Sequence, residues 1–77
     1  MSDVVDWREE DGVWSAVVDE MLVTVRRVDG PYVRVTVNNG PSGGPQIASA
    51  AIETRWEEIG QRAGEALARA LKGQKLR

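Results

Sequence analysis

The feature that most constrains the fold is an alternation of apolar and polar residues that stays in phase through three turn signals. Three short segments mark the turns: Asp11-Gly12, Asp19-Glu20 and Asp29-Gly30-Pro31. The second turn lacks a glycine and is the poorest of the three. Reversing the chain at each turn gathers one apolar set on a single face: Val5, Trp7, Trp14, Ala16, Val18, Val23, Val25, Val33, Val35 and Val37. Since a slip of one residue would move such a set into water, the agreement of three turns predicts a four-stranded antiparallel meander over residues 3–37.

The rest of the chain changes character after the segment NNGPSGGP (38–45). Apolar residues then recur at spacings of three and four, which is typical of a helix: Ile52, Trp56, Ile59, Ala63, Ala66 and Ala70. Pro45 suits the first turn of a helix. The sequence therefore predicts one α+β domain over residues 1–77 with the order ββββα. Residues 38–45 would be a crossover loop, residues 46–72 the helix packed on one sheet face, and residues 73–77 a basic tail.

The length of the predicted helix raises the question of what covers its far end. Residues 46–72 would span roughly 40 Å, whereas four strands are only about 19 Å wide. Leu67 and Leu71 would then lack cover within the chain. Two outcomes would solve this: the helix breaks at Gly60 or Gly64 and folds back, or a second copy covers the overhang. We favour a homodimer with Leu67 and Leu71 as its contact.

Composition excludes several classes of chemistry. The chain has neither cysteine nor histidine, so disulfides, Cys/His zinc sites and histidine-based triads are excluded. The carboxylates of Glu9, Glu10 and Asp11 fall in a predicted hairpin turn, where such groups are normally solvated. We therefore expect a protein that is not an enzyme and uses no cofactor or metal.

Three further features of the sequence bear on the cellular location and the origin of the protein. The acidic N-terminal segment resembles neither a signal peptide nor a basic transit peptide, and no apolar run is long enough to span a membrane. We expect a cytoplasmic protein. The abundance of valine and of arginine over lysine suggests a bacterial or phage origin.

Two glycine motifs and the tryptophans have structural interpretations. The segment NNGPSGGPQ lacks both the GK[ST] ending of a phosphate loop and the pattern GxGxxG. The segment GQRAG (60–64) places two glycines four residues apart, which would let the helix approach the sheet or a partner closely. Trp7, Trp14 and Trp56 are all expected in the core. Arg27 falls at the edge of the core face beside Val33, where its head would reach water.

The outer face of the predicted sheet carries the candidate binding residues. In the proposed register Arg26 lies opposite Arg34, an arrangement that is mildly destabilising unless an anion lies between them. That anion could be Glu10, a carboxylate of a partner or a phosphate. Arginine and tyrosine among aliphatic residues are typical of protein-interaction surfaces. The predicted partner-binding residues are Leu22, Arg26, Val28, Tyr32 and Arg34.

Two functional hypotheses follow. The first is a small regulatory protein that binds another protein, of unknown identity, through this face or through the helix end. The alternative is a nucleic-acid-binding module that uses Arg8, Arg26, Arg34 and the basic tail. The net charge of −2, with seven acids and one arginine in residues 1–20, gives nucleic acid less support.

Overall fold

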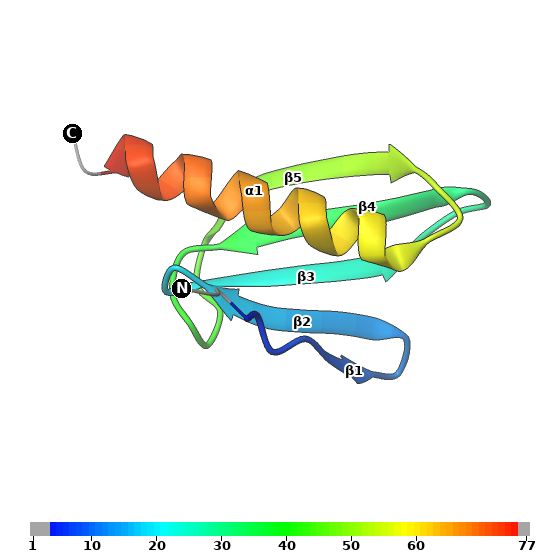
Figure 1. The fold of residues 1–77 in the computed structure, drawn as a ribbon, viewed down its shortest axis with the longest axis horizontal. Coiled ribbons are helices and arrows are strands. Elements are labelled where there is room, and N and C mark those ends of the chain that lie inside the picture. Colours follow the sequence, from blue (N-terminus) through cyan, green and yellow to red (C-terminus); the bar gives the residue numbers. More distant parts are fainter. Residues whose placement is uncertain (1–3, 76–77) are drawn as a thin grey trace.

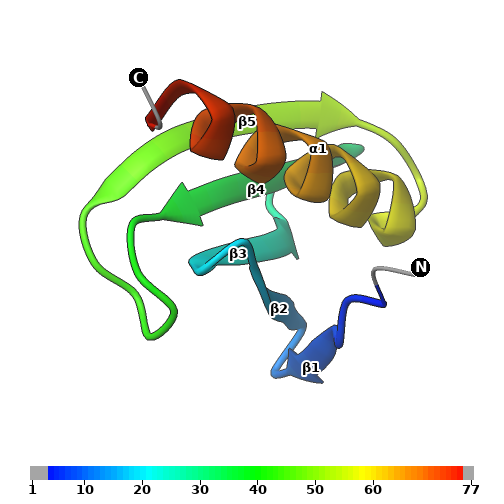
Figure 2. The same cartoon turned by 60° about the vertical axis from the view of Figure 1, so that its left-hand side comes forward.

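The computed structural model describes residues 4–75 as a five-stranded antiparallel sheet with one C-terminal helix on one face (Figures 1 and 2). The elements are β1 (Arg8–Glu10), β2 (Val13–Val18), β3 (Met21–Arg27), β4 (Tyr32–Asn38), β5 (Gln46–Glu53) and α1 (Glu57–Lys75). Strands neighbouring in sequence are neighbours in the sheet, in the order β1-β2-β3-β4-β5. The α+β class, the antiparallel sheet and the C-terminal helix are confirmed, but the sheet has one strand more than predicted.

The predicted registers of β2, β3 and β4 are confirmed. Trp14 lies opposite Val25, and Val25 lies opposite Val35. The turn between β2 and β3 forms without glycine because Asp19 and Glu20 both adopt left-handed backbone conformations, with φ of 52° and 68°. Positive φ at both central residues is the signature of the type I′ turn, whose twist matches that of a hairpin.

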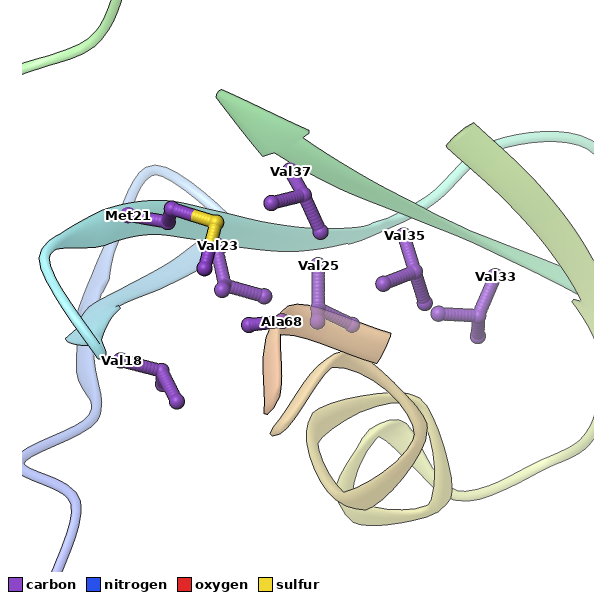
Figure 3. Close-up of a cluster of buried hydrophobic side chains, with 8 residues drawn as sticks. All are labelled: Val18, Met21, Val23, Val25, Val33, Val35, Val37 and Ala68. Carbon is purple, nitrogen blue, oxygen red and sulfur yellow. The ribbon is translucent and has the colours of Figure 1, made fainter. Parts of the chain in front are cut away.

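The core lies between α1 and the inner face of β2, β3 and β4 (Figure 3). Its buried cluster consists of Val18, Met21, Val23, Val25, Val33, Val35, Val37 and Ala68. Trp7 and Trp14 pack half-buried against this cluster. The predicted core face of the sheet is therefore confirmed for β2–β4, while Val5 and Trp7 reach the core from outside β1.

The prediction of a helix from residue 46 is wrong, because residues 46–53 form β5. This strand pairs antiparallel with β4 and places Ala50 opposite Val35, so it satisfies the backbone groups of β4 that a four-stranded sheet would leave open. The segment 38–45 is accordingly a hairpin loop and not a crossover. The loop is closed by the Asn39 N–H, which donates to the Pro45 carbonyl at 2.9 Å.

The helix starts late because a local turn fixes its beginning. The Thr54 hydroxyl accepts a hydrogen bond from the Trp56 N–H at 3.1 Å, and Glu57 follows three residues after Thr54. The spacing matches the sequence of a capping box, but the reciprocal bond is not formed, because Glu57 is the first helical residue and its carboxylate accepts a hydrogen bond from Arg27 at 3.2 Å. The Thr54 hydroxyl instead closes a short turn just before the helix. Arg27 supports the same junction, donating to the carbonyls of Thr54 at 3.1 Å and Arg55 at 2.9 Å. The head of Arg27 is thus bound by the chain and does not simply reach water.

The two glycines of GQRAG form the contact between α1 and the sheet. A Cβ added to Gly60 would lie 2.9 Å from the Cγ1 atoms of Val25 and Val33, and one added to Gly64 would lie 2.5 Å from Cγ1 of Val23. Such distances leave no room for a side chain. The glycines therefore allow the close approach that the sequence predicted, and neither breaks the helix, which runs unbroken over 19 residues.

The helix face toward the sheet differs from the predicted stripe. Trp56 and Ile59 were expected in the core, yet they are 61% and 42% exposed. Leu67 and Leu71 were expected to lack cover, yet both are half-buried against the core cluster. The expected overhang follows from starting the helix eleven residues too early. The error at Trp56 and Ile59 follows from assigning the helix face by the spacing of large apolar residues. The helix also extends to Lys75, into the predicted tail, and residues 76–77 lie outside the described residues.

Among residues 4–75 no helix combines the length and the apolar character that crossing a membrane requires.

Candidate functional site on the outer sheet face

The outer face of β3 and β4 brings together four of the five predicted partner-binding residues. Arg26 lies directly opposite Arg34, as predicted. One step further toward the β3–β4 turn, the Val28 N–H donates to the Tyr32 carbonyl at 3.1 Å. All four side chains are exposed. Because they alternate with the buried valines of the same strands, they point away from α1.

The two arginines have no anionic partner among the described residues. Arg34 Nη1 donates to the Ser49 hydroxyl at 3.1 Å, which orients its guanidinium toward β5. None of the ion pairs among residues 4–75 includes Arg26 or Arg34. Glu10, one of the predicted counterions, pairs with Val13, and Val13 separates it from Arg26. Glu10 therefore does not serve as the anion between Arg26 and Arg34 in this structure.

A shallow hollow of about 250 Å³ on this face is lined in part by the two arginines. Its lining combines guanidinium, hydroxyl and amide groups with one valine: Val13, Thr24, Arg26, Arg34, Thr36 and Gln46. Thr24 and Thr36 lie opposite each other, and their hydroxyls form a hydrogen bond across the strands. Two fixed positive charges beside hydroxyl donors suit a carboxylate or a phosphate, because charge-assisted hydrogen bonds are the strongest that such groups can accept.

Exposed apolar side chains lie at both ends of the outer face, with Val28 and Tyr32 next to the arginines and Val17 opposite Leu22. Val28 is 38% exposed, Tyr32 is 43% exposed and Val17 is 50% exposed. Leu22, the fifth predicted residue, is different: it is half-buried at the opposite end of β3. The loop between β4 and β5 lies against it there, and the Leu22 N–H donates to the Gly40 carbonyl at 3.0 Å. The structure thus separates Leu22 from the other four residues.

Sequence reasoning missed part of this site. Two residues of the site come from β5, which was predicted as a helix, so their positions could not be inferred. They are Gln46, which lines the hollow, and Ser49, which accepts the hydrogen bond from Arg34. Thr24 and Thr36 alternate with the buried valines and therefore lie on the outer face, but nothing in their spacing marks them as part of a hollow.

The candidate catalytic and nucleic-acid residues at the β1–β2 hairpin are solvated. Glu9, Glu10 and Asp11 are all exposed, and no three acidic side chains of residues 4–75 converge where they could hold a metal ion. Arg8, which the nucleic-acid hypothesis requires, forms an ion pair with Asp6 at 3.1 Å.

Comparisons of this chain with protein-family models, with curated proteins and with solved structures found no match.

Proposed function

We propose that this protein is a small, non-enzymatic regulatory module that binds an acidic segment of another protein through its outer sheet face. The observation that carries the proposal is the opposed pair Arg26 and Arg34, which lines a hollow and has no carboxylate partner within residues 4–75. A carboxylate bound between the two guanidinium groups would relieve their repulsion. The exposed Val28 and Tyr32 next to them would supply the apolar contact that protein interfaces usually add.

An acidic peptide fits the surroundings of the arginines better than a nucleic acid does. A nucleic acid lying across the sheet would extend past the hollow and meet Glu10 on β1 and Glu53 on β5, both exposed. Nucleic-acid binding depends on many phosphate contacts, whereas among residues 4–75 only Arg26 and Arg34 are available on this face without an ion pair. A short peptide with one or two carboxylates needs no more than that pair. A cytoplasmic location, where the protein would meet such a partner, belongs to the same proposal.

The proposal can be tested by NMR titration of the ¹⁵N-labelled protein with a synthetic peptide of alternating glutamate and leucine. We expect amide shifts on the outer face of β3 and β4, centred on Arg26, Arg34 and Thr36. The double variant Arg26→Gln, Arg34→Gln should abolish these shifts. The matched control is Arg62→Gln, which removes a charge from an exposed helix position and should leave the shifts unchanged.

Two results would contradict the proposal. One is the absence of shifts on β3 and β4 at low ionic strength. The other is tighter binding of a DNA or RNA oligonucleotide to the same arginines, with an affinity that falls steeply as salt is added, since that dependence is diagnostic of phosphate contacts. The second result would establish the nucleic-acid alternative in its place.

A further inference from the structure

The two edges of the sheet differ in how they are protected against pairing with another strand. Edge strands expose unpaired N–H and C=O groups, and proteins usually guard them by shortness or by charges, including charges that point inward. The β1 edge has such guards: it is three residues long, all are charged, and Glu9 lies on the inner row opposite Trp14. The β5 edge is eight residues long and carries a single charge, Glu53, at its end.

The unpaired backbone groups of β5 can be assigned to particular residues. The Thr54 N–H donates to the Pro31 carbonyl at 2.9 Å, so the hydrogen-bonded pairs between β4 and β5 fall at the even-numbered residues 50 and 52. The odd-numbered residues Ser49, Ala51 and Glu53 therefore direct their N–H and C=O groups away from β4. No strand among residues 4–75 pairs with that side of β5.

The side chains next to this edge are uncharged and small. On the inner row of β5, Ala50 is exposed, while Ala48 and Ile52 are half-buried, because α1 packs mainly on β3 and β4. Gly60, Gly64 and Ala68 face the sheet, and Glu65 reaches Trp7 on the β1 side. Helical geometry then places an uncharged row on the flank toward β5. This alanine flank consists of Ile59, Ala63, Ala66 and Ala70.

We propose that a second copy of this chain pairs with the β5 edge, so that two β5 strands run antiparallel about a two-fold axis through Ala50. In this register Ser49 of one copy lies opposite Ala51 of the other, and both residues direct their backbone groups toward the interface. The two sheets become one continuous sheet. Both helices lie on the same side of it, and their alanine flanks face each other across Ala48, Ala50 and Ile52.

The second copy is favoured as the occupant because the edge is complementary to itself. A two-fold contact requires that each feature meet its own counterpart. About Ala50, the one charge of the strand, Glu53, lies opposite Ile47, so no like charges oppose each other. Pro45, which has no N–H to donate, stays outside the paired residues. The proposal is independent of the proposed function, because the outer face with Arg26 and Arg34 remains exposed in the pair.

Single-cysteine variants test the register directly, because the chain has no cysteine of its own. The Ala50 pair would be of the non-hydrogen-bonded kind, with Cα atoms about 4.5 Å apart, which is within the roughly 4.4–6.8 Å that a disulfide requires. We expect Ala50→Cys to form a covalent dimer on mild oxidation. Glu10→Cys, equally exposed but on the guarded β1 edge, should remain a monomer. Equal cross-linking of the two variants would overturn the proposal.

Sedimentation of the unmodified chain supplies a second test that depends on no substitution. We expect a mass of twice 8.5 kDa that falls to 8.5 kDa on dilution. Ala50→Lys places a charge at the two-fold axis and should abolish the dimer, while circular dichroism confirms that the fold is retained. The proposal is wrong if the unmodified chain is monomeric even at about 1 mM, where a very weak association would still be visible. It is equally wrong if the dimer survives Ala50→Lys.

Discussion

The two sides of α1 differ in the contacts that they make with the rest of the chain. On the β1 side, polar contacts join α1 to distant segments: Trp7 Nε1 donates to Glu65 Oε2 at 2.8 Å, and Lys72 Nζ lies 3.7 Å from Asp19 Oδ1. On the β5 side, α1 presents the alanine flank, and β5 presents small apolar residues and an open edge. Figure 1 shows α1 lying between these two sides, with β5 above it and β1 and β2 below it.

This difference shows that one short helix cannot cover five strands. Two neighbouring strands are about 4.8 Å apart, and a helix is roughly 10 Å across, so α1 covers about two strands fully. The glycines place it on β3 and β4, and the polar contacts tie it toward β2. The inner row of β5 is consequently the part of the core face that is left exposed.

The largest effect is expected at Gly64, where α1 approaches the sheet most closely. Gly64→Ala would place a Cβ 2.5 Å from the Val23 side chain and force α1 away from the sheet. Overpacking of this kind costs about 1–3 kcal/mol, which should exceed the gain in helix propensity of about 1 kcal/mol. We expect a lower free energy of unfolding, measured by urea denaturation.

Gly73 provides the matched control within the same helix. A Cβ at Gly73 would meet nothing within 4 Å, so Gly73→Ala should stabilise the protein by up to about 1 kcal/mol. If the two substitutions had the same effect, the close contact of Gly64 with β3 would not determine where α1 lies on the sheet. The exposure of the inner row of β5 would then need another explanation.

The sequence was sufficient to predict the parts of the fold that local pattern determines. Three hairpins had to share one buried face, and this condition fixed the pairing of Trp14 with Val25 and of Arg26 with Arg34. β5 escaped prediction because alanine has a high intrinsic helix propensity. Its strand conformation is imposed by the open edge of β4, which is a tertiary effect. The spacing of Thr54 and Glu57, which matches the S/T-x-x-E pattern found at helix starts, was the available signal that the helix begins only near there.

The same error explains what was missed at the candidate site and at the surface. Since residues 46–53 were assigned to a helix, Ser49 and Gln46 could not be placed on the same sheet face as Arg34, and no open edge was expected. The helix phase was also assigned from its large apolar residues, although the close contact is made by Gly60 and Gly64. Small residues give little signal in a hydrophobic pattern, yet they determine which face of a helix can approach a sheet.

An intermediate effect is expected from the hydrogen bond between Trp7 and Glu65. Trp7→Phe keeps an aromatic ring against the core but removes the indole N–H, and hydrogen bonds to charged groups contribute about 1.5–3 kcal/mol. Because both residues are only half-buried, we expect a loss of about 1–2 kcal/mol in the free energy of unfolding. Trp14→Phe makes the same change in ring size at a half-buried tryptophan with no hydrogen bond of this kind. Equal losses for the two variants would mean that packing, and not this bond, ties α1 to the β1 side.

The smallest effect is expected from Lys72 and Asp19, whose side chains are 48% and 32% exposed. An ion pair this exposed contributes about 0–1 kcal/mol and is screened by salt. A double-mutant cycle with Lys72→Gln and Asp19→Asn measures the pair alone, and asparagine is chosen because it tolerates the left-handed conformation of the turn. We expect a coupling of at most about 0.5 kcal/mol that vanishes near 1 M salt. A larger coupling would show that electrostatic attraction contributes substantially to holding α1 toward the β1 side. A coupling near zero would leave the asymmetry of the helix to the Trp7–Glu65 hydrogen bond and to the glycine contact, which are insensitive to salt.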